Sequence, residues 1–97
     1  MKWRSDLYLK WIRSQPCMIT GEPTSDAHHA KCKGLGMGAK CHDLFTIPLT
    51  RLRHSERHSM ARSDWEEKYG NEAEMVLQMI NQALEEGVIQ IQFREEL

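Results

Sequence analysis

The sequence predicts a small α+β protein, and three observations lead to that prediction. The chain has 97 residues, the length of one domain with a modest core. Short apolar segments bounded by turn residues are typical of strands, whereas apolar residues at helical spacing over 72–86 predict a long helix. The expected architecture is a β-hairpin plus a helix, flanked by N- and C-terminal helices, within a single domain over 1–97.

The N-terminal part is expected to start with a helix and to continue as a hairpin. A short helix through Arg13 can be capped by Ser5 or Asp6, and the proline that follows it ends the helical region. Segments 17–19 and 26–30 are then expected to pair as strands across an intervening turn that contains glycine and proline.

The C-terminal part is expected to be mostly helical, because capping residues recur there at helix-like intervals. The expected elements are an extended apolar segment over 44–49, a helix from a Thr50 cap to about 58, a helix with a capping box at Ser63–Glu66 that stops at Gly70, a helix over 72–86 capped by Asn71, and a terminal strand over 88–92.

Composition limits the possible partners and the cellular compartment. The formal net charge is -1, so a nucleic acid would have to be bound by a local basic patch and not by the field of the whole protein. The N-terminus has no apolar leader, and no stretch is long and apolar enough to span a membrane. We therefore expect a cytoplasmic protein with reduced cysteines, no disulfide framework and no membrane partner.

Four of the five histidines form the most informative pattern in the chain. His54 and His58 are four residues apart, so on a helix they share one face and can bind one metal ion. His28 and His29 are adjacent, so on a strand they point to opposite faces. One of these two can complete the metal site, while the other stays free to accept a proton, a task that suits an imidazole near neutral pH.

Several short motifs around these histidines carry a family resemblance. They are Pro16-Cys17, Asp26-Ala27-His28-His29, Gly36-Met37-Gly38-Ala39-Lys40, His42-Asp43-Leu44, Ile47-Pro48-Leu49, His54 through His58 and Trp65-Glu66-Glu67-Lys68-Tyr69-Gly70. Through them the chain resembles the HNH (ββα-metal, or His-Me finger) endonuclease superfamily, and most closely the phage and prophage Ref-like (RecA-dependent) HNH nucleases. The resemblance implies a ββα-metal core over about 16–60, a C-terminal helical part over about 63–97, and DNA hydrolysis in phage or prophage recombination or DNA processing within a bacterial host cell.

The resemblance also implies a role for each site residue. His28, His54 and His58 would hold one divalent ion (Zn, Mn, Ni or Mg), and no small-molecule cofactor is implied. His29 would be the general base that activates water, while the ion stabilises the leaving oxygen. Asp43 falls at the family's middle position, where it would pin the loop or orient His29, although an aspartate can also simply cap a turn.

One departure from the family pattern removes a second metal site. Many HNH domains hold a structural zinc on two Cys-x-x-Cys knuckles, of which this chain keeps only Cys17. One thiolate cannot form such a site, so we expect no structural zinc held by four cysteines. Cys32 and Cys41 could bind a metal together with His42, but free cysteines are the expected state.

DNA is the expected partner, and the resemblance adds a RecA filament. The glycine-rich segment 31–43 is either a simple connection or a loop whose backbone and lysines approach phosphate. Each basic side chain alone is adequately explained as a solvated charge, but their clustering near the histidines favours DNA. The candidate contacts are Lys31, Lys33, Lys40, Arg51, Arg53 and Arg57, with Arg62 following them.

Two other classes of protein fit parts of the pattern. A non-catalytic, metal-bearing DNA-binding or adaptor module would use the same three ligands and would not need His29. A purely structural protein with chance histidines would retain no stoichiometric metal after dialysis.

Overall fold

Side-chain capping fixes where three of the described helices begin. The computed structural model describes residues 2–31 and 40–94, and in these the helices are α1 (Asp6–Arg13), α2 (Arg51–Ser59), α3 (Arg62–Tyr69) and α4 (Glu72–Glu85). The side chains of Ser5, Thr50 and Asn71 accept backbone N–H bonds at the starts of α1, α2 and α4. The predicted caps of these three helices are therefore confirmed.

The two strands are farther apart in the chain than the sequence suggested. Strand β1 (Asp26–His29) pairs antiparallel with β2 (Thr46–Leu49), and His28 lies opposite Ile47. The expectation that segment 17–19 pairs with β1 is wrong. That segment is a turn closed by Gly21, whose N–H donates to the carbonyl of Cys17, and Met18 N–H donates to the carbonyl of Pro48 at 3.0 Å.

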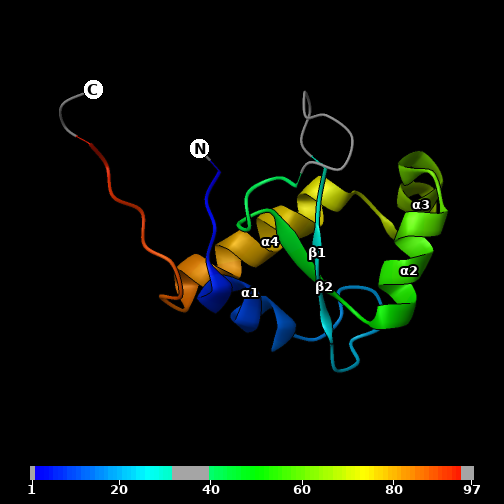
Figure 1. Cartoon of the computed structure of the whole chain (residues 1–97), viewed down its shortest axis with the longest axis horizontal. Helices are drawn as coiled ribbons and strands as arrows, with labels where there is room; N and C mark the ends of the chain where they lie inside the picture. Colours follow the sequence, from blue (N-terminus) through cyan, green and yellow to red (C-terminus); the bar gives the residue numbers. More distant parts are fainter. Residues whose placement is uncertain (1, 32–39, 95–97) are drawn as a thin grey trace.

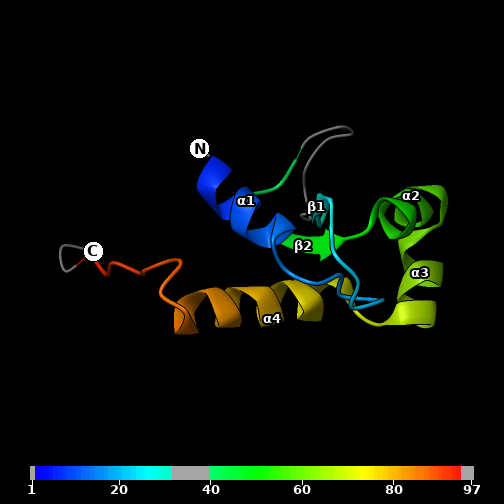
Figure 2. The same ribbon diagram turned by 90° about the horizontal axis from the view of Figure 1, so that it is seen from below.

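The helices surround this two-stranded sheet. Both α1 and α4 pack against β2, and α2 contacts both strands. Figure 1 shows the strands near the centre of the protein, with α2 and α3 together at one side. In the second view, the strands lie between α1 and α4 (Figure 2). The β1 face that meets α2 is therefore the face on which a site can form between strand and helix.

A continuous apolar core fills the space between these layers. Trp65 of α3, Ile12 of α1 and Ile47 of β2 are fully buried, and Val76 and Met79 of α4 pack in the same cluster. Most of the apolar face predicted for this helix therefore faces the core, but Leu84 at its end is exposed. None of the helices in the described ranges is long and apolar enough to cross a membrane.

Three further expectations need correction. Helix α3 starts after Ala61 without a side-chain cap, so the Ser63 capping box is wrong. Segment 88–92 forms no strand, since no other strand lies beside it in the described structure and Ile91 is exposed. Cys17 is a free thiol, but the buried Cys41 is disulfide-bonded, so the expectation of reduced cysteines is wrong there.

Candidate metal centre

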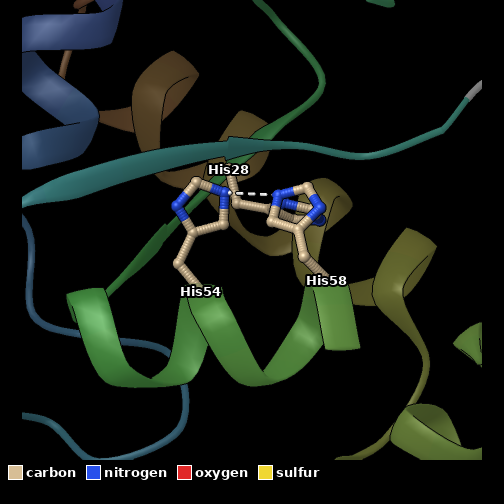
Figure 3. Close-up of side chains that lie close together, drawn as sticks. All are labelled: His28, His54 and His58. Carbon is tan, nitrogen blue, oxygen red and sulfur yellow. Dashed lines mark hydrogen bonds between the residues drawn. The ribbon is translucent and has the colours of Figure 1, made fainter. Parts of the chain in front are cut away.

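Three histidines from β1 and α2 converge at the strand–helix interface. His28 is 3% exposed on β1, while His54 and His58 project from one face of α2 toward it (Figure 3). One ring nitrogen from each of the three lies within 4.8 Å of the others. The sequence prediction that these histidines gather is confirmed as geometry, and the reason is local: Thr50 starts α2 directly after β2.

The nitrogen positions fit a metal ion. The Nε2 atoms of His54 and His58 are 3.0 Å apart, close to the ~3.3 Å expected between two nitrogens that share a tetrahedral ion at about 2.0–2.1 Å. Both ring nitrogens of His28 are buried and have no hydrogen-bond partner among the described residues. A buried imidazole without a partner is costly unless a ligand satisfies it, and an ion at this position would do so.

The protonation states of the site also favour metal binding. Burial lowers the pKa of His28, although Glu72 opposes this shift. Burial lowers the pKa of His58 as well, and the neighbouring His54 adds to the effect. Both imidazoles are therefore neutral near pH ~7, and neutral imidazole is the form that donates a lone pair to a metal.

Asp26 orients one of the three rings. Its Oδ2 lies 2.8 Å from Nδ1 of His54, and Arg51 Nε pairs with the same oxygen at 2.9 Å. Burial alone would raise the pKa of Asp26, but hydrogen bonds from His54 and Arg51 outweigh it and hold the pKa below its usual value. Because an ionised carboxylate can only accept, His54 carries its proton on Nδ1, and Nε2 is left with a lone pair toward the cluster.

His29 lies beside the cluster of three histidines, and its ring is positioned by a different carboxylate, Asp43. Its Nε2 is 2.8 Å from Oδ1 of Asp43. Asp43 also accepts the backbone N–H of Ser5 at 2.9 Å and pairs with Arg4 at 3.1 Å. Burial would raise the pKa of Asp43, but the bonds from His29, Ser5 and Arg4 keep it lowered. Asp43 thus lies where it can orient His29, one of the roles considered for it from sequence.

A pocket of about 430 Å³ joins the two histidine groups. Its lining brings two of the three clustered histidines, His29 and two lysines together: it comprises Ala27, His29, Ala30, Lys31, Lys40, Cys41, His54 and His58. The ammonium groups of Lys31 and Lys40 belong to exposed side chains at this pocket. The pocket therefore combines cations, a candidate ion site and a candidate base, a combination suited to a phosphate ester.

The remaining predicted DNA contacts differ in burial and in the residues that they pair with. Arg57 is buried and paired with Glu72 at 2.7 Å, so it does not reach the surface and its assignment to DNA is wrong. Arg53 is bound to Glu56 at 2.9 Å and to the hydroxyl of Tyr69 at 2.7 Å, which turns its guanidinium toward α3.

Of the other three predicted contacts, Arg51 is exposed and engages Asp26, and Arg62 is exposed at the start of α3. Lys33 lies outside the described residues.

Three partners of the site were missed from sequence. Asp26 had a usable signal, since it stands two residues before His28 on the same face of a strand. Arg4 and Glu72 reach the site only through the fold, and nothing in their local sequence marks them.

Together these features define a small α+β domain with a three-histidine candidate cation site and an adjacent aspartate-held histidine. Residues 1–87 match the DUF968 family, described as a protein of unknown function, and the chain belongs to this family. It is 40% identical over 89 residues to the uncharacterized protein YdfU of Escherichia coli (strain K12), an alignment that covers 91% of this chain and 25% of YdfU. No solved structure matches the chain.

Proposed function

We propose that this protein is a metal-dependent DNA endonuclease with a ββα-metal core of the HNH type. One observation carries the proposal: the ligand histidine and the candidate base are neighbours on β1. His28 joins His54 and His58, while His29 is held by Asp43 at 2.8 Å, and the lysine-lined pocket connects the two groups. A site that only bound metal would not need a further histidine, paired with an aspartate, beside the three ligand histidines.

The Asp43 contact selects the basic atom of His29. An ionised carboxylate at Nε2 accepts that nitrogen's proton in a hydrogen bond, so the lone pair resides on Nδ1. Nδ1 would accept a proton from the attacking water as the water oxygen bonds to phosphorus. As the phosphorus–O3′ bond breaks, the leaving oxygen takes a proton from solvent water, which gives a 5′ phosphate and a 3′ hydroxyl. The imidazolium formed on His29 faces the Asp43 carboxylate and then releases its proton to solvent.

His28, His54 and His58 would hold the ion. A divalent cation there would neutralise charge on the phosphate and its leaving oxygen. Three nitrogen donors suit Zn, Ni, Co or Mn better than Mg, which prefers oxygen ligands. Lys31 and Lys40 would attract the phosphodiester without reading base sequence, so we expect weak sequence preference.

The test is plasmid cleavage by the wild type and by His29→Ala, with Mg, Mn, Ni and Zn supplied separately. Bound metal is measured on the same samples, and Asp64→Asn on the exposed side of α3 is the matched surface control. We expect the wild type and the control to cut, and His29→Ala to lose about 10²–10⁴-fold in rate while it retains metal.

If no protein cuts, the assay is repeated on DNA carrying RecA filaments. Failure there too, with metal and DNA binding intact in both wild type and His29→Ala, would replace the nuclease by a metal-bearing binding module. Absence of stoichiometric metal in the wild type would remove the metal centre altogether.

A further inference from the structure

A buried glutamate from α4 reaches the cluster of three histidines. Glu72 is the first residue of α4 and is only 2% exposed, whereas acids in a first helical turn usually face solvent. Its own backbone N–H donates to Oε2 of Glu66 at 2.7 Å. Burial of this carboxylate therefore needs an explanation beyond helix capping.

Only one oxygen of Glu72 is accounted for by an ion pair. Oε2 accepts from Nε of Arg57 at 2.7 Å, and the pair is buried on both sides. Oε1 points instead to Nε2 of His28 at 3.5 Å. Neither Glu72 Oε1 nor His28 Nε2 has a hydrogen-bond partner within the described ranges. A hydrogen bond between these two atoms would satisfy both.

The position of Arg57 strengthens the connection. It precedes His58 on α2, and its ion pair with Glu72 ties α2 to α4 beside the ligands. The same ion pair keeps Glu72 a carboxylate, whose oxygens can only accept, so the atom facing it on His28 must carry a proton to bond with it.

We infer that Glu72 is a positioning residue for the candidate metal centre: it accepts Nε2–H of His28, so that the lone pair of this imidazole resides on Nδ1, the nitrogen that would then bind an ion. This inference rests on the proposed function for the presence of an ion, but the tautomer of His28 does not depend on it. Asp26 holds Nδ1–H of His54, so the two ligands would bind through opposite nitrogens, each fixed by a carboxylate from a different element.

The consequence is that the metal site extends to α4. His28 belongs to β1 and the other two histidines to α2, so the ligands alone join two elements. With Glu72 included, an ion that draws His28 into place also fixes the start of α4.

The first measurement needs no substitution. Nitrogen NMR of the imidazoles in metal-free wild-type protein reports which nitrogen of His28 is protonated. We expect the proton on Nε2. A proton on Nδ1 would overturn the inference, whether or not the protein binds metal.

The second measurement compares Glu72→Gln with Glu66→Gln. Glutamine at 72 can still accept from Arg57, but its amide group donates toward His28 and favours the wrong tautomer. Glu66 contacts the backbone of residue 72 and is the matched control. We expect Zn or Ni affinity, measured by calorimetry, to fall about 10–100-fold in Glu72→Gln and to stay unchanged in the control.

The outcomes separate the inference from the proposed function. Wild-type affinity in a folded Glu72→Gln would reject the positioning role and leave the nuclease proposal standing. No metal binding by the wild type would reject the metal centre, while the tautomer measurement would still decide the role of Glu72.

Discussion

Replacing Asp43 by asparagine tests the link between fold and chemistry most directly. The substitution keeps the size of the side chain and removes the charge that faces His29 at 2.8 Å. An amide can also present its NH₂ group to Nε2, which would move the imidazole proton to Nδ1, the nitrogen proposed as the base. Under the proposed nuclease function, the variant should therefore fold and yet cleave DNA poorly.

The size of the effect follows from the geometry. At an effective dielectric of about 20, opposite charges 2.8 Å apart attract by about 6 kcal/mol, which corresponds to roughly 10⁴-fold in rate. Because His29 is partly exposed and Arg4 already neutralises part of Asp43, this value is an upper limit. We expect a loss of about 10²–10⁴-fold, comparable to removal of the base itself.

The assay is single-turnover cleavage of a labelled duplex in the metal that best supports the wild type. Metal affinity and circular dichroism are measured in parallel, with Asp64→Asn as the surface control. A rate within about threefold of wild type, in a folded and metal-loaded variant, would refute the reasoning that Asp43 sets the tautomer and stabilises the imidazolium of His29.

Three further predictions concern metal binding and stability. Asp26→Asn should weaken Zn or Ni binding about 10–100-fold by releasing His54, and calorimetry showing unchanged affinity would contradict this. Trp65→Ala should lower the free energy of unfolding by about 3–5 kcal/mol, since the indole is fully buried; a loss below about 1 kcal/mol in urea titration would contradict it. The lowered pKa of Asp43 contributes stability that is complete above the ordinary carboxyl value of 3.8 and is lost as pH falls through the lower folded value. The stability advantage of wild type over Asp43→Asn should therefore narrow below about pH 4, and urea midpoints that keep a constant difference would contradict the shift.

Sequence reasoning succeeded where the determining interactions are local. Ser5, Thr50 and Asn71 cap helices through bonds to residues three positions onward, so short motifs were sufficient. The gathering of His54 and His58 follows from helical spacing alone.

Sequence reasoning failed where the partner is distant along the chain. Segments 17–19 and 46–49 are both apolar, and only tertiary packing decides that the second pairs with β1. The role of Glu72 could not be predicted for the same reason, because its approach to His28 depends on how α4 packs against the sheet. The burial of Arg57 was missed for the same reason: an arginine on a polar helix looks solvated until its acidic partner from another helix is known.

The pairing of Ala27 with Pro48 has a consequence for how the protein behaves at high concentration. A two-stranded sheet exposes an edge on each strand, and a free edge can recruit a strand from another molecule. At Pro48 the backbone has no N–H to offer, and its carbonyl already accepts from Met18. An incoming chain would find neither donor nor free acceptor at this position, so pairing with a strand from another molecule is interrupted at Pro48.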